Sequence, residues 1–201
     1  MPGGCRGGKQ IDRLVSLCKA HRVARTWLSI RVDLIEGGGA VMWPRPGRIF
    51  AAARTQTFAD LANAIDDAFA RWDRAHLHMF DLGDSDGLLI DQSWDDPPDD
   101  SRVDHAVKLS VLNPGQQFVY VFDLGDNWTH LRTVGARRID PLDALGVTPQ
   151  RPTPYWGWGT LPDQYGRGWD GDDGDTPEPP DPDVRVARFG RARDEPSDLF
   201  V

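Results

Sequence analysis

Two histidines separated by one residue are the first side chains in this sequence that could do chemistry. His76 and His78 flank Leu77. Alternate residues of a β-strand share a face about 7 Å apart, since each residue adds about 3.3–3.4 Å. Two imidazoles at this spacing could enter the coordination shell of one metal ion. The pattern fits better with a half-buried strand whose histidines are satisfied by hydrogen bonds.

A second candidate site is the segment Phe118–His130, FVYVFDLGDNWTH, in which two aromatic-rich stretches flank a Gly-Asp-Asn turn. This pattern is typical of a β-hairpin. Its chemistry depends on register, because opposed residues share a face and a slip of one residue reverses the faces. With an odd number of loop residues, Phe122 pairs with Trp128, and Tyr120 pairs with His130.

With an even number of loop residues, Asp123 pairs with Trp128 and the polar side chains share one face of the hairpin. That face would carry Asp123, Trp128, His130 and Arg132. We favour this register because it separates the polar groups from the aromatic ones.

In the even register, the Asp123 carboxylate could orient the His130 imidazole, tune its pKa or share a metal ion with it. The candidate metal ligands are then His78, Asp123 and His130. A divalent metal is a possible cofactor, and we expect no other. The alternative, which is the more economical, is that Asp123 and Asp126 bond the amides of the turn, as aspartate commonly does.

A third candidate is the aromatic segment PYWGWGTLPDQYG (154–166), which contains Trp156 and Trp158. Its rings could stack on a base or a sugar. More often such a segment is an irregular arm whose rings cover an exposed core, and we favour this structural interpretation.

A few regular elements must position these residues. Apolar side chains alternate with polar ones over residues 28–34, which predicts a half-buried strand. Thr57 and Asp60 form a capping-box pattern at the start of a helix. The apolar stripe of this helix runs from Phe58 to Trp72 and must be buried against a sheet. Asp66 and Arg71 fall outside the stripe.

These elements predict an α+β fold with a single mixed or antiparallel sheet, one covering amphipathic helix and a β-grasp-like arrangement. We expect three parts: a flexible or helical N-terminal extension (residues 1–25), the α+β domain (26–169) and a disordered acidic C-terminal tail (170–201). Residues 170–183 contain seven acidic residues, four prolines and no basic group. Such a segment cannot bury enough apolar surface to offset the entropy of ordering.

Composition excludes several classes of protein. The 201 residues carry 23 Lys and Arg against 31 Asp and Glu, a net charge of −8. This acidic balance opposes tight duplex binding, although residues 1–54 hold ten basic and three acidic groups. No apolar run could span a membrane, so we expect no membrane partner. Two cysteines and a start without an apolar signal core favour a cytoplasmic location.

Two of the motifs also resemble a known family. The segments AHLHMF (75–80) and FxYxFDLGDxWxH (118–130) are similar to the plasmid Ri ORF-three-like family, with a resemblance that covers roughly residues 26–169. Some of its members are labelled TnpR passenger proteins of an insertion element. The segments RTQTFAD (54–60) and WGWGTLPDQY (156–165) resemble an actinobacterial branch. A cysteine-containing segment that ends many members is missing here.

The resemblance implies an α+β domain and an association with plasmids or mobile elements, but no established activity. Our leading hypothesis is therefore an uncharacterised cytosolic protein that acts as a non-enzymatic binding or accessory module. It would work through a groove at the hairpin, and a protein or small-molecule partner is favoured over nucleic acid. The candidate binding residues are His76, His78, Asp123, Asp126, Trp128, His130, Trp156 and Trp158.

Two alternatives remain open. The first is a metal-dependent hydrolase in which His and Asp of the hairpin hold a metal-bound water. The second is a nucleic-acid-binding accessory protein that uses the basic N-terminal quarter and the Trp-rich segment. No phosphate-binding Gly-rich loop, serine-hydrolase elbow or His-Glu-x-x-His motif supports another enzyme class.

Overall fold

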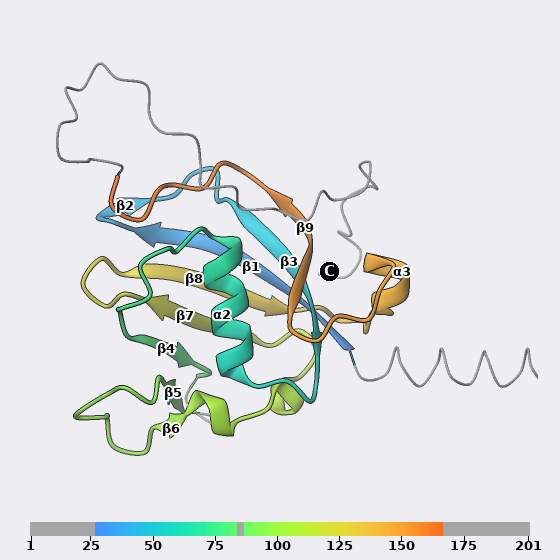
Figure 1. Ribbon diagram of the computed structural model, residues 1–201, viewed down its shortest axis with the longest axis horizontal. Coiled ribbons are helices and arrows are strands. Elements are labelled where there is room, and N and C mark those ends of the chain that lie inside the picture. Colours follow the sequence, from blue (N-terminus) through green and yellow to red (C-terminus); the bar gives the residue numbers. More distant parts are fainter. Residues whose placement is uncertain (1–26, 84–86, 167–201) are drawn as a thin grey trace, which may run out of the picture.

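The computed structural model describes residues 27–83 and 87–166. Within them, nine strands form one mixed sheet in the order β6-β5-β4-β7-β8-β1-β3-β9, and β2 pairs with β1 (Figure 1). All of the pairs are antiparallel except β5–β6. The strands are β1 (Trp27–Gly37), β2 (Ala40–Val41), β3 (Gly47–Ala53), β4 (His78–Asp81), β5 (Leu88–Ile90), β6 (Arg102–Val103), β7 (Gln117–Phe122), β8 (Trp128–Val134) and β9 (Thr153–Trp158).

Helices are few in these ranges: α2 (Phe58–Ala68), α3 (Pro141–Leu145) and the 3₁₀ turns η1 (Asp104–Ala106) and η2 (Leu109–Val111). The described part of the chain is therefore mostly β, with one mixed sheet as predicted and little helix. The β-grasp-like arrangement remains a prediction. Residues 1–25 and the acidic tail lie outside the described residues. Within residues 27–83 and 87–166, no helix is long and apolar enough to cross a bilayer.

Helix α2 lies across one face of the sheet (Figure 1). It begins with the predicted capping box: the Asp60 amide donates to Thr57 Oγ1 over 3.1 Å, and the Thr57 amide donates to Asp60 Oδ2 over 2.8 Å. Phe58, Leu61 and Ile65 are fully buried, in one cluster with the apolar side chains of the sheet. Burial of this stripe is what holds so short a helix in place.

The end of α2 differs from the prediction. The helix stops at Ala68, and Ala70 has a positive φ of 56°. Helical periodicity therefore cannot be extended to Trp72, which is 56% exposed instead of buried. Asp66 and Arg71, which we expected outside the buried stripe, are both buried.

Strand β1 is buried on both faces, although its alternating pattern predicts a half-buried strand. On its polar face the Ser29 hydroxyl lies 2.7 Å from the hydroxyl of Tyr155, which belongs to β9, the strand beyond β3 in the sheet. Trp27 forms a second, smaller cluster there with Ala51 and Ile139. The polar residue Ser29 of this alternating strand is therefore buried and does not face solvent.

Candidate functional site

The β7–β8 hairpin has the odd register. Phe122 pairs with Trp128, and Tyr120 pairs with His130. The even register that we favoured from the sequence is therefore wrong. Asp123 belongs to the turn: its φ is 53°, and its Oδ1 accepts hydrogen bonds from the amides of Gly125 and Asp126. This is the structural alternative that the sequence left open.

The odd register places the polar residues of β8 in the core beneath α2. His130 is fully buried, and its ring meets the Phe69 ring edge-on at 4.8 Å between centroids. Burial, together with the nearby charges of Arg132 and Arg71, lowers the pKa of His130 well below its ordinary value. His130 is therefore a neutral core residue, and the expected recess shared by Asp123 and His130 does not form.

The proposed metal ligands do not converge. His78 Nε2 lies 2.8 Å from Asp104 Oδ2, so this histidine is satisfied by a different carboxylate. Within residues 27–83 and 87–166, no three His, Cys, Asp or Glu side chains are arranged to hold a metal ion. The predicted set of His78, Asp123 and His130 is therefore wrong as a metal site, because the three side chains belong to different environments.

A second buried polar group lies between α2 and the sheet. The Tyr120 hydroxyl donates to Asp66 Oδ1 over 2.8 Å, and Arg74 donates to Asp66 Oδ2 over 2.7 Å. Burial raises the pKa of Asp66 to about 6, although Arg74 and Tyr120 act in the opposite direction. The Arg132 guanidinium lies 4.8 Å from the centre of the Tyr120 ring. Ring faces thus provide part of the solvation that water gives to exposed cations.

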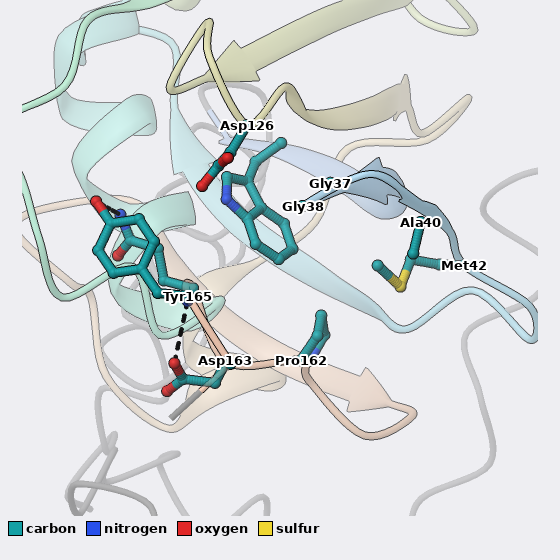
Figure 2. A pocket seen from close by; sticks show the side chains of 11 residues that line it. Gly37, Gly38, Ala40, Met42, Asp126, Pro162, Asp163 and Tyr165 are labelled. Atoms are coloured by element: carbon teal, nitrogen blue, oxygen red, sulfur yellow. Dashed lines mark hydrogen bonds between the residues drawn. The ribbon is translucent and has the colours of Figure 1, made fainter. Parts of the chain in front are cut away.

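A pocket of about 520 Å³ opens where three distant segments meet. Figure 2 shows the β1–β2 turn facing the segment 162–166 across this pocket, with Asp126 of the hairpin turn between them. The volume lies in the range of small-molecule sites, roughly 300–1,000 Å³. The lining residues are Gly37, Gly38, Ala40, Met42, Asp126, Trp128, Pro162, Asp163, Gln164, Tyr165 and Gly166.

One wall of the pocket is built around the Trp128 indole, which contacts the backbone of Gly37 and the guanidinium of Arg71. A Cβ atom added at Gly37 would lie 2.1 Å from Trp128 Cε3, so only glycine lets the indole lie against the backbone. On the indole the Arg71 Cζ atom lies 3.6 Å from the ring centroid. Burial lowers the pKa of Arg71 to about 10, which leaves the guanidinium charged at neutral pH and favours a cation–π contact.

A chain of polar groups connects Tyr165, on the pocket wall, to the hairpin turn. The Tyr165 hydroxyl lies 2.6 Å from His76 Nε2 and 3.1 Å from Asp73 Oδ2, so its single proton has two possible acceptors, of which His76 is the nearer. On the other side of the imidazole, Nδ1 lies 3.3 Å from Asp123 Oδ2. The structure therefore brings two predicted residues together, His76 and Asp123, but their third partner is Tyr165.

The two tryptophans of β9 have structural contacts. Trp158 Nε1 donates to the Arg45 carbonyl over 2.9 Å, and the Arg31 guanidinium lies 4.7 Å from the centre of its ring. Trp156 pairs with Ile49 of β3. Neither tryptophan lines the pocket at Trp128.

Sequence reasoning missed several residues of this region: Gly37, Arg71, Asp73 and Tyr165. A signal existed for Gly37, since three consecutive glycines follow Glu36, but we interpreted them only as a turn. Tyr165 lies in the aromatic segment and Asp73 follows Trp72, and neither has a spacing that connects it to His76.

With the geometry described, comparison with known proteins places the chain in a family. Residues 30–145, more than half of the chain, match the family described as plasmid pRiA4b ORF-3-like protein. The chain belongs to this family. The matched range of the pRiA4b ORF-3-like protein includes His76 and Asp123 but ends before Tyr165. The insertion-element label and the actinobacterial branch remain predictions.

A solved structure is similar to part of this chain. It is protein MM3350 of Methanosarcina mazei Go1, described as a protein of unknown function. The two chains are 21% identical, with a TM-score of 0.47, and the match covers 66% of this chain and 68% of the other. No curated protein matches the sequence.

Proposed function

We propose that this protein is a binding module whose pocket accepts a small organic cation, an alkylammonium or guanidinium group. The observation that carries the proposal is the pocket between the β1–β2 turn, the β7–β8 turn and residues 162–166. Its lining combines the exposed ring of Tyr165 with the carboxylates of Asp126 and Asp163, and this composition favours a cation carrying a short apolar chain.

The charge of the lining supports this ligand class. Asp126 and Asp163 line the pocket, and none of its eleven lining residues is Lys, Arg or His. Partial desolvation raises the pKa of Tyr165, and the hydrogen bond to Asp73 and the charges of Asp73, Asp123 and Asp126 raise it further. The carboxylates of Asp73, Asp123 and Asp126 give this side of the pocket a negative potential. The same potential disfavours anionic ligands.

The alternatives have less support. A metal-dependent hydrolase needs converging ligands, and the proposed ones are dispersed among different partners. Nucleic-acid binding would bring phosphates to a carboxylate-lined pocket, which costs electrostatic energy; the basic residues before Trp27 lie outside the described part of the chain. A non-enzymatic role, a cytoplasmic location and a link to mobile elements accompany this proposal as expectations.

The proposal can be tested with a matched pair of probes, butylammonium and butyrate, which share one apolar chain and differ in charge. In calorimetric titrations we expect butylammonium to bind and butyrate not to bind. Asp126→Asn should weaken binding by about tenfold, or about 1.4 kcal/mol. The turn should survive this substitution, because Asp126 contacts Gly38 through its main-chain carbonyl.

Two further variants make the test specific. Asp99→Asn removes the same charge from a residue that does not line the pocket, and its affinity should equal that of the wild type. Gly37→Ala pushes a methyl group into the Trp128 ring and should abolish binding. Equal affinity for butyrate, or an Asp126→Asn variant that binds like Asp99→Asn, would refute the proposal.

A further inference from the structure

Three side chains beside the pocket are arranged as a hydroxyl, a base and an orienting carboxylate. His76 Nε2 lies 2.6 Å from the Tyr165 hydroxyl, and His76 Nδ1 lies 3.3 Å from Asp123 Oδ2. Asp123 is itself held in the hairpin turn, because its Oδ1 accepts hydrogen bonds from the amides of Gly125 and Asp126. The imidazole is one-third exposed, and Tyr165 is 44% exposed, so both groups are accessible.

A hydroxyl within hydrogen-bond reach of a base, with that base oriented by a third group, is the arrangement of an activated nucleophile. We propose that Tyr165 is a covalent modification site, an acceptor for an acyl group from an activated ester. His76 acts as the base, and Asp123 is a positioning residue. This inference goes beyond cation binding and does not depend on which ligand the pocket holds.

The surroundings of Tyr165 explain why it needs a base. Partial desolvation, the hydrogen bond to Asp73 and the charges of the nearby carboxylates raise the pKa of Tyr165, so little tyrosinate forms at neutral pH. The hydroxyl must therefore lose its proton as the new bond forms, and His76 Nε2 is the nearest acceptor, at 2.6 Å compared with 3.1 Å for Asp73 Oδ2.

The same carboxylates select the electrophile. Asp73 and Asp123 both lie within ion-pair distance of His76 and would repel a multiply charged phosphoryl group, whereas an ester is neutral. In the step that we infer, Tyr165 Oη bonds to the carbonyl carbon and the bond from that carbon to the leaving oxygen breaks. The tyrosine proton passes to His76 Nε2, and His76 then donates that proton to the departing alkoxide, which leaves as the alcohol and restores the neutral imidazole.

The other tyrosines serve as internal comparisons. The chain has three tyrosines. Tyr120 is fully buried and donates to Asp66. Tyr155 is half-buried, with its hydroxyl 2.7 Å from that of Ser29. Tyr165 is thus the one with both an imidazole against its hydroxyl and a large exposed surface.

The experiment uses 4-nitrophenyl acetate as the acyl donor and follows acetylation of each tyrosine by peptide mass spectrometry. We expect Tyr165 to be acetylated first. His76→Asn should slow this acetylation by about 100-fold or more, toward the rate of Tyr155, because general-base assistance contributes about 10²–10⁴-fold in catalysis. His105→Asn, which alters an exposed histidine outside this group, should have no effect.

These variants separate a base from a structural contact. If His76 made only a structural contact, His76→Asn would expose Tyr165 further and leave its acetylation unchanged or faster. That result would overturn the proposal. Tyr165→Phe should remove the fast, stoichiometric phase of 4-nitrophenolate release, and persistence of that phase would also overturn it. Neither result bears on butylammonium binding, so the two proposals fail independently.

Discussion

At the level of single residues, this protein buries polar groups that the sequence pattern placed at the surface. Asp66 is accommodated by Tyr120 and Arg74, with hydrogen bonds of 2.8 and 2.7 Å. His130 is accommodated as a neutral ring against Phe69. A buried polar group left without a hydrogen-bond partner costs about 1–3 kcal/mol, and Asp66 avoids this cost through its two partners.

The raised pKa of Asp66 predicts a pH dependence of stability. Its folded pKa of about 6 exceeds the ordinary 3.8, so between these values the folded chain holds a proton that the unfolded chain releases. Stability from this group therefore falls as pH rises through that window. Asp66→Asn lacks this loss, and its free energy of unfolding relative to wild type should rise by about 2 kcal/mol from pH ~4 to pH ~7.

Urea unfolding at the two pH values measures this difference. Asp67→Asn changes the charge at a half-exposed neighbour in the same turn and serves as the control. A constant difference between Asp66→Asn and wild type across the window would contradict the assigned pKa.

At the level of elements, α2 depends on both its cap and its buried face. Its N-terminus is satisfied by Thr57 and Asp60, while Phe58 and Ile65 supply the apolar face. The hairpin illustrates a different dependence. Asp123 and Asn127 both have positive φ values, 53° and 54°. The turn therefore spans residues 123–127, three more than a two-residue Gly125–Asp126 loop would take from the strands.

Thr57→Ala tests the cap. The substitution removes the acceptor for the Asp60 amide and should lower the free energy of unfolding by about 1 kcal/mol. Asn63→Ala, on the exposed side of the same helix, introduces a better helix former and should change stability little or raise it. Urea unfolding of both variants measures the two effects, and equal stability of Thr57→Ala and wild type would show that the box is dispensable.

At the level of the whole molecule, the sheet has buried central strands and two edge strands. Strands β7, β8 and β1 are central, while the two-residue β6 and the strand β9 end the sheet (Figure 1). The pocket lies where the central strands β1 and β8 meet residues 162–166. One wall of the pocket therefore lies at the ends of central strands, and its outer wall depends on a segment beyond the last strand.

This arrangement predicts a gradient of amide protection. Hydrogen exchange followed by mass spectrometry should show the slowest exchange in β1 and β8 and the fastest among the strands in β6, because edge strands open without unfolding the sheet. Protection of β6 equal to that of β8 would contradict the strand order.

Local patterns were sufficient for several features. The Thr57–Asp60 capping box, the amphipathic start of the following helix and the alternation over residues 28–34 each predicted an element that the structure contains. The physical reason is that capping, helical periodicity and strand alternation depend on residues only a few positions apart.

Only the tertiary structure decided the register of the hairpin, the burial of Asp66 and His130, and the meeting of Tyr165 with His76. Each of these depends on groups distant in sequence: the helix α2, which packs on the sheet, and a segment 89 residues after His76. Their positions follow from how the whole chain packs, and local spacing carries no information about it.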